Sequence, residues 1–258
     1  MNKHFVLTSG RSGSNYISDL LTRHPNVINY GEVLGEWTTG YKANKYLRIG
    51  NGDAGKYLDF IYRGKGYFQL SQGYQSLKAL VKPNQRPPQK SWSDIQSYGV
   101  KDFAMTLIDR GAADFLKNNP DIRVISLHRE NALRRFASVH MLDETGVVSS
   151  AHAKDSGTAH KVKQQVYLDP ETLINDLKRT EKVVQDQLDM VAKLPKERVL
   201  SIRYEDLFAS EQSKHDFAQQ MFEFIGVKPL DLESSHKKLN ASNLKDLIQN
   251  YDEVFDIC

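Results

Sequence analysis

The chain has 258 residues, 40% of them hydrophobic, which is enough apolar material for the core of one α/β domain spanning residues 1–258. Its formal net charge of +3 suits a small anionic ligand and gives no indication of a nucleic acid partner. The one cysteine, Cys258, excludes an internal disulfide framework and a metal cluster held by thiolates. No long apolar segment follows the N-terminus, so we expect a soluble cytoplasmic protein with no stable membrane anchor.

The first predicted unit is a strand followed by a turn and a helix. Residues 5–7 form a short apolar run before a Ser-Gly turn, which is typical of a buried parallel strand. Apolar residues at helical spacing over 16–21 predict a helix that ends before Pro25. Residues 41–88 have weak periodicity, and we expect short helices and loops there, with a mobile lid as one alternative.

The rest of the chain alternates between predicted strands and helices. Asp169 and Pro170 are typical of the N-cap and the first position of a long helix. Residues 144–168 are polar enough to predict an exposed, mobile loop. The alternation implies an α/β fold with a parallel sheet of about four or five strands and helices on both faces. In chain order, these predicted elements are a strand over 98–103, a helix over about 109–118, a strand over 123–127, a helix from about 130, the long helix from 169, a strand over 198–202 and a helix over 217–225.

A turn rich in glycine and serine, residues 9–15, joins the first strand to the first helix. At such a junction backbone N–H groups and the helix dipole converge on one anion. The two glycines let the backbone approach a ligand closely, the hydroxyls add hydrogen-bond donors, and the arginine adds a charged fork. An ordinary turn is the alternative, but the position and content of the segment favour anion binding. The candidate ligand-binding residues of this turn are Arg11, Ser12, Gly13, Ser14 and Asn15.

This turn is not a Walker A loop. Gly13 is followed by Ser14 and Asn15, whereas a Walker A loop has a lysine there that contacts the terminal phosphates. The cation lies earlier in the turn, as Arg11. An ATP-dependent kinase is therefore a second hypothesis, and a non-catalytic nucleotide-binding module is a third.

A second candidate site begins at Arg129, just after the strand predicted over 123–127. Ligands bind beyond the carboxyl ends of the strands in doubly wound sheets, so we expect Arg129 to face the same crevice as the turn at 9–15. Ser138, nine residues later on a predicted helix, could return to the same anion. Two anion clamps at one crevice suit a ligand with phosphates on both sides of its ribose. The alternative is that Arg129 forms an ordinary surface ion pair.

These segments resemble those of sulfotransferases that use 3′-phosphoadenosine 5′-phosphosulfate (PAPS). Residues 5–16 are similar to the 5′-phosphosulfate loop of that family, residues 123–138 to its 3′-phosphate site, and residues 204–207 to its Tyr-Glu-Asp-Leu segment. The arrangement is most similar to that of bacterial sulfotransferases that act on carbohydrates and glycolipids. Asn15 stands where a threonine is usual, and the pair 130–131 stands where Asp-Pro is common.

The resemblance implies transfer of a sulfuryl group from PAPS to a hydroxyl of a carbohydrate, glycolipid or other hydroxylated small molecule. It implies a glutamate shortly after the first helix as general base, and Glu32 matches that position best, with Glu36 in reserve. Both could instead be solvated surface carboxylates. A histidine such as His128 or His140 is another candidate base, and Lys101 could contact the sulfonate or the acceptor. A homodimer remains open.

No metal site stands out in the sequence, which has no HExxH helix and no CxxC pair. The best magnesium candidates, Glu205 and Asp206, are explained equally well as helix N-cap residues. Sulfuryl transfer needs no metal, because the moving group carries less charge than a phosphoryl group.

Overall fold

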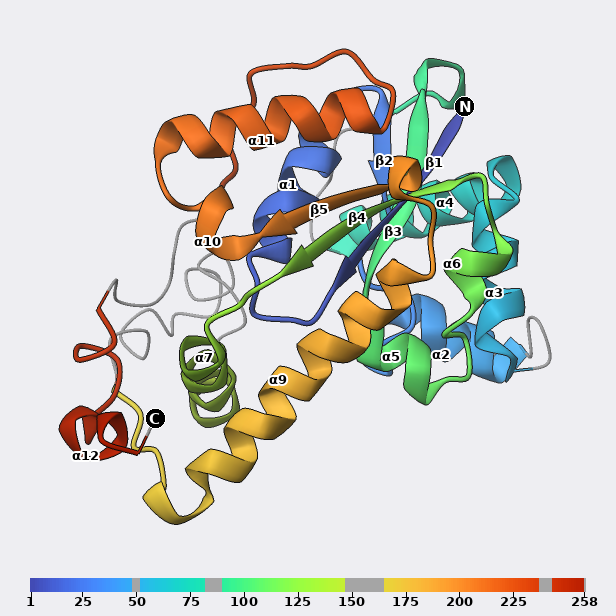
Figure 1. Ribbon diagram of the computed structural model, residues 1–258. Coiled ribbons are helices and arrows are strands. Elements are labelled where there is room, and N and C mark those ends of the chain that lie inside the picture. Colours follow the sequence, from blue (N-terminus) through green and yellow to red (C-terminus); the bar gives the residue numbers. More distant parts are fainter. Residues whose placement is uncertain (48–51, 82–89, 147–164, 237–242, 258) are drawn as a thin grey trace.

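The computed structural model describes residues 1–47, 52–81, 90–146, 165–236 and 243–257 (Figure 1). Its five strands form one sheet in the order β2-β3-β1-β4-β5, and every neighbouring pair is parallel. The predicted α/β fold with a parallel sheet is therefore confirmed. The strands are β1 (Asn2–Thr8), β2 (Val27–Asn29), β3 (Ser97–Phe103), β4 (Ile122–His128) and β5 (Val199–Arg203).

Helices cover both faces of the sheet, as predicted. Figure 1 shows α1 and α11 over one face, and α3, α5 and α9 on the other side. None of the helices within the described ranges has both the length and the apolar character needed to cross a membrane. The helices are α1 (Ser14–Arg23), α2 (Thr39–Leu47), α3 (Ala54–Tyr62), α4 (Lys65–Val81), α5 (Ala104–Asp109), α6 (Phe115–Asn118), α7 (Ala132–Thr145), α9 (Pro170–Ala192), α10 (Tyr204–Leu207), α11 (Glu211–Phe224) and α12 (Tyr251–Phe255).

The central strand β1 contributes to the core on both faces of the sheet. Successive side chains of a strand point to opposite faces. Accordingly, Phe5 and Leu7 pack with buried residues of α3, α5 and the end of α9, whereas Val6 packs with those of α1 and α11. All three side chains are fully buried. A strand that is covered on both faces buries consecutive side chains, which explains the continuous apolar run over residues 5–7.

The predicted start of the long helix is confirmed, but the helix predicted over 109–118 is wrong. The Asp169 side chain accepts a hydrogen bond from the Glu171 N–H, and Pro170 is the first residue of α9. In place of a helix over 109–118, α5 ends at Asp109 and α6 begins only at Phe115. Gly111 lies between them with a φ of 69°, in the left-handed region that interrupts a right-handed helix.

The lid alternative for residues 41–88 is also wrong within the described part of that segment. Tyr57, Leu58 and Ile61 of α3 are almost completely buried and belong to the core cluster that contains Phe5. The next helix, α4, has 17 residues and is longer than the short helices we expected. Residues 48–51 and 82–88 of this segment lie outside the described residues.

The loop predicted over 144–168 falls mostly on residues 147–164, which lie outside the described residues. At the C-terminal end of the segment 144–168, the expectation that its residues are exposed is wrong. Val166 and Leu168 are buried, and Val166 forms a parallel bridge with Ile248. This end of the segment packs with α7 and the N-terminal part of α9, which its polar composition does not reveal.

His4 on β1 makes the stability of the fold depend on pH. It is fully buried, its Nδ1 lies 2.9 Å from Ser97 Oγ, and burial lowers its pKa to about 3. An unfolded histidine, with a pKa of about 6.5, binds a proton in the window between pH 6.5 and 3 that the folded protein does not bind. The free energy of unfolding should therefore fall as the pH falls through this window, by up to about 1.4 kcal/mol per pH unit.

We predict that His4→Asn removes this contribution and flattens the dependence of the free energy of unfolding on pH. Urea unfolding at several pH values between 4 and 6 measures the slope for both proteins. Parallel slopes for the variant and the wild type would contradict the assignment to His4.

Candidate functional site

The turn between β1 and α1 has a strained backbone. Gly10 and Gly13 have φ values of 78° and 83°, and Arg11 has a φ of 53°. Arg11 is the one non-glycine residue with a positive φ in the described part of the chain. Such strain persists only where the surrounding structure fixes the backbone, and it is concentrated at functional sites. The turn leads directly into α1, which begins at Ser14. The N–H groups of the first turn of an α-helix have no i−4 carbonyl partner within the helix and can bind an anion.

Gly13 packs against the Tyr-Glu-Asp-Leu segment that forms α10. A Cβ at Gly13 would lie 2.5 Å from Cε2 of Phe208 and 3.3 Å from Cδ2 of Tyr204. Only glycine allows this approach. The Cζ of Arg129 lies 4.1 Å from the centroid of the Tyr204 ring, a cation–π contact. Tyr204 therefore lies between the turn and the end of β4.

The two predicted anion clamps meet directly. The Nε of Arg11 donates a hydrogen bond of 2.9 Å to the Oγ of Ser138 on α7. Arg129 is the first residue after β4, and its Nη1 donates a hydrogen bond of 3.4 Å to the Arg11 carbonyl oxygen. Both Arg129 and Ser138 are buried. The two segments that carry the predicted clamps are therefore in direct contact.

Arg135 on α7 is a component of the site that the sequence analysis missed. Its Nη2 donates to the Ser9 carbonyl, its Nε to the Gly10 carbonyl at 3.2 Å, and its Nη1 to the Thr180 carbonyl on α9 at 3.2 Å. It thereby fixes two carbonyl groups of the turn. The pair Arg134-Arg135 was visible in the sequence, but only the helix position shows which of the two points to the turn.

Positive charge is concentrated at this turn. The pKa values of Arg11, Arg129 and Arg135 are all lowered, mainly by burial, and that of Arg135 to about 10. The charge of Arg129 contributes to the lowering for both Arg11 and Arg135. Repulsion between buried cations indicates a place where an anion would be stabilised.

Arg129 has a donor to offer such an anion. Its Nε is buried and has no hydrogen-bond partner among the described residues. The nearest carboxylate oxygen is Oε1 of Glu205, at 4.0 Å, too far for a hydrogen bond. Glu205 instead accepts from the N–H groups of Glu130 and Asn131, both at 3.2 Å. A phosphate or sulfate oxygen would satisfy the Arg129 Nε.

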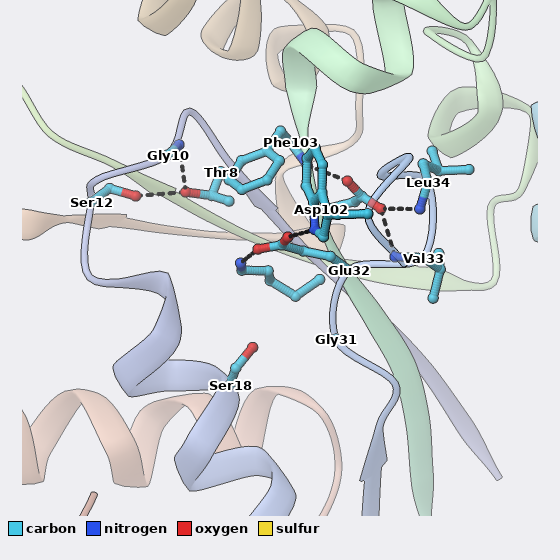
Figure 2. A network of polar contacts seen from close by, with 12 residues as sticks. Thr8, Gly10, Ser12, Ser18, Gly31, Glu32, Val33, Leu34, Asp102 and Phe103 are labelled. Carbon is cyan, nitrogen blue, oxygen red and sulfur yellow. Dashed lines mark hydrogen bonds and ion pairs between the residues drawn. The ribbon is translucent and has the colours of Figure 1, made fainter. Parts of the chain in front are cut away.

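The remaining predicted residues of the turn differ in accessibility. Ser12 is fully buried, and its hydroxyl lies 2.6 Å from Thr8 Oγ1, so it supports the turn from inside (Figure 2). Thr8 Oγ1 also accepts a hydrogen bond of 3.2 Å from the Gly10 N–H. Ser14 is buried at the start of α1, and Asn15 is half-buried.

Glu32 lies beside the same turn. Its Oε1 accepts from the Nζ of the buried Lys101, and its Oε2 accepts from the Trp37 Nε1 at 2.9 Å. The Lys101 Nζ lies 4.8 Å from the centroid of the Phe103 ring, and a Cβ at Gly10 would be 3.4 Å from that ring. Lys101 and Phe103 thus connect Glu32 to the turn, and Figure 2 shows Glu32 within this network.

A buried carboxylate holds the segment that carries Glu32. The Oδ2 of Asp102 accepts from the N–H groups of Val33 and Leu34 at 2.9 and 2.8 Å, and its Oδ1 accepts from the Phe103 N–H (Figure 2). Burial raises the pKa of Asp102. The sequence analysis did not single out Asp102, although a carboxylate inside a strand predicted to be buried is a usable signal.

Glu36 does not join this network within the described structure. It is 68% exposed, and its Oε1 lies 3.5 Å from Nη2 of Arg110, which packs over the Tyr41 ring. Of the two predicted bases, Glu32 is therefore the one that lies beside the turn between β1 and α1.

The two histidine alternatives lie on α7 and at the end of β4. His140 pairs with Glu144 on α7 at 3.2 Å. His128 is buried, and burial lowers its pKa. It lines, with Arg129, a cleft of about 670 Å³ between the end of β4 and α9.

The described residues include no cluster of three or more His, Cys, Asp or Glu side chains that could hold a metal ion. The two magnesium candidates have protein partners. Asp206 pairs with Arg203 at 2.6 Å, and Glu205 accepts the backbone N–H groups given above.

The solved structures similar to this chain include three sulfotransferases. A sulfotransferase from Alicyclobacillus acidocaldarius has a TM-score of 0.45 and 15% identity over 95% of this chain and 88% of that chain. The sulfotransferase domain of the Synechococcus PCC 7002 olefin synthase has a TM-score of 0.44 and 18% identity over 97% of this chain and 82% of that chain. The sulfotransferase domain of the curacin biosynthetic pathway has a TM-score of 0.43 and 18% identity over 95% of this chain and 82% of that chain. No family model and no curated protein matches the sequence. The fold class rests on the sheet order above.

Arg135→Lys should weaken binding of adenosine 3′,5′-bisphosphate by at least about tenfold, because lysine lacks the fork that holds the Ser9 and Gly10 carbonyls. Isothermal titration calorimetry measures the dissociation constant. Arg179→Lys, at a residue of α9 whose side chain is 82% exposed, is the matched control and should bind as the wild type does. Wild-type affinity in Arg135→Lys would show that this arginine does not shape the turn.

Proposed function

We propose that this chain is a PAPS-dependent sulfotransferase that transfers a sulfuryl group to a hydroxyl of a carbohydrate or glycolipid acceptor. The observation that carries the proposal is the hydrogen bond between Arg11 and Ser138. It joins the turn after β1 to the segment after β4, so that the two candidate anion clamps lie side by side beyond the carboxyl ends of these strands.

The donor fits the distribution of positive charge. Arg11 and the N–H groups at the start of α1 would hold the 5′-phosphosulfate, and Arg129 with Ser138 would hold the 3′-phosphate. The buried Nε of Arg129, which has no hydrogen-bond partner among the described residues, supports this assignment. A ligand with anionic groups on both sides of one ribose uses both clamps at once, which a ligand with a single phosphate cannot do.

Glu32 is the proposed general base. As the acceptor oxygen forms its bond to sulfur, the bond between sulfur and the bridging oxygen of the 5′-phosphate breaks, and its electron pair leaves with adenosine 3′,5′-bisphosphate. The acceptor proton passes to the Glu32 carboxylate. Lys101 and Trp37, which donate to the two Glu32 oxygens, keep the carboxylate beside the turn.

Specific features disfavour the two alternatives. A kinase of this shape would use a lysine directly after Gly13, where this chain has Ser14. A non-catalytic nucleotide-binding module would not need a carboxylate at the site, whereas contacts through Lys101 and Phe103 bring Glu32 to it.

Glu32→Gln keeps the shape of the side chain and removes its basicity, so it should lower turnover by roughly two to four orders of magnitude. Affinity for adenosine 3′,5′-bisphosphate should stay nearly unchanged. The assay is transfer of radiolabelled sulfate from PAPS to a panel of glycans and glycolipids.

Glu36→Gln is the matched control, because Glu36 is exposed and pairs with Arg110, and it should do much less. If the effects of the two variants are reversed, Glu36 is the base. If the wild type transfers no label while binding adenosine 3′,5′-bisphosphate, the protein is a binding module.

A further inference from the structure

Trp37 is an exposed indole that the backbone holds in a defined place. It is 64% exposed, yet its Nε1 donates to Glu32 Oε2 at 2.9 Å, and its ring centroid lies 6.4 Å from that of Phe103. An exposed tryptophan gains little from apolar burial. Core packing therefore does not explain why the indole lies in a fixed position beside Glu32.

Gly35 makes that position of the indole possible. A Cβ at Gly35 would lie 2.4 Å from Cε2 and 2.5 Å from Cζ2 of Trp37, distances that no real Cβ tolerates. Residue 35 must be glycine for the ring to lie against this turn. Hydrogen bonds of 2.9 and 2.8 Å from the N–H and Oγ1 of Thr38 to the Gly35 carbonyl close the turn.

The segment is anchored on its other side as well. Val33 and Leu34 are buried, and the Asp102 carboxylate accepts both of their N–H groups. The Lys101 N–H donates a hydrogen bond of 3.0 Å to the Gly31 carbonyl, so the backbone is fixed on both sides of Glu32, and the turn closed between Gly35 and Thr38 carries Trp37. The orientation of Trp37 relative to Glu32 is built into the fold before any ligand binds.

We propose that Trp37 positions both the base and the acceptor: its N–H fixes Glu32, and its exposed ring face receives the C–H face of a pyranose ring. This inference rests on the proposed function. Aromatic rings with one polar edge suit ligands that are partly apolar and partly hydrated. A pyranose has C–H groups on its face and hydroxyls at its rim, so a ring stacked on Trp37 directs a rim hydroxyl toward Glu32.

Three variants separate these two roles. Trp37→Phe keeps an aromatic face and removes the N–H, Trp37→Leu removes both, and Gly35→Ala displaces the ring while Trp37 is retained. Tyr46→Leu, at an aromatic residue that is 84% exposed on α2, is the matched control. Calorimetry with adenosine 3′,5′-bisphosphate should give wild-type affinity for all four, which checks that each variant is folded.

The kinetic expectations follow from the contacts. Trp37→Phe should lower kcat by about tenfold with a change in KM for a methyl pyranoside of no more than about threefold. Trp37→Leu and Gly35→Ala should also raise KM by about tenfold or more. Wild-type KM and wild-type kcat in Trp37→Leu would overturn the proposal.

Fluorescence provides a readout that does not depend on transfer. The chain has two tryptophans, so in a Trp92→Phe background Trp37 is the remaining indole. Titration of methyl glycosides of glucose, galactose and N-acetylglucosamine into this protein, with adenosine 3′,5′-bisphosphate bound, should shift its emission saturably to shorter wavelength. No response to any of these sugars would overturn the pyranose assignment. A saturable shift in a protein that transfers no sulfate would support the platform and reject the proposed function.

Discussion

Half-buried Arg11 and the buried Arg129 and Arg135 bring three positive charges to the turn between β1 and α1. Taking a charge out of water costs several kcal/mol unless partners replace the water. Arg135 is satisfied by carbonyl groups of Ser9, Gly10 and Thr180, whereas the Nε of Arg129 lacks a hydrogen bond within the described structure. A bound anion would stabilise this arrangement, and such preorganised charge is what the proposed transfer of an anionic group requires.

The fold supplies this convergence through contacts between distant segments. Helix α9 contacts both parts of the site. Its Thr180 carbonyl accepts a hydrogen bond from Arg135. Its Gln187 Nε2 donates hydrogen bonds of 3.2 Å to the carbonyl groups of Leu7 and Leu127. Those carbonyls lie near the carboxyl ends of β1 and β4, the two strands that lead into the anion clamps. The relative position of the clamps therefore depends on the same helix that covers the sheet (Figure 1).

Local patterns in the sequence predicted the turn at 9–15, Arg129, Ser138 and the parallel sheet, because each depends on residues close in sequence or on strand ends meeting at one edge. Features set by tertiary contacts were not predictable in this way. Gly111 interrupts the helix predicted over 109–118, and β2, with three residues, is too short to show a period. The roles of Arg135, Asp102 and Trp37 depend on partners 45 to 126 residues away or on the local fold of a turn, which no spacing rule encodes.

The proposed function requires both clamps to bind one ligand. Calorimetry of the wild type with adenosine 3′,5′-bisphosphate and with adenosine 5′-monophosphate, both without magnesium, tests it most directly. Charge-assisted hydrogen bonds from Arg129 and Ser138 to a 3′-phosphate should make the bisphosphate bind about 100-fold more tightly. Equal affinities would contradict the account, and tighter binding of magnesium-ATP than of the bisphosphate would favour a kinase.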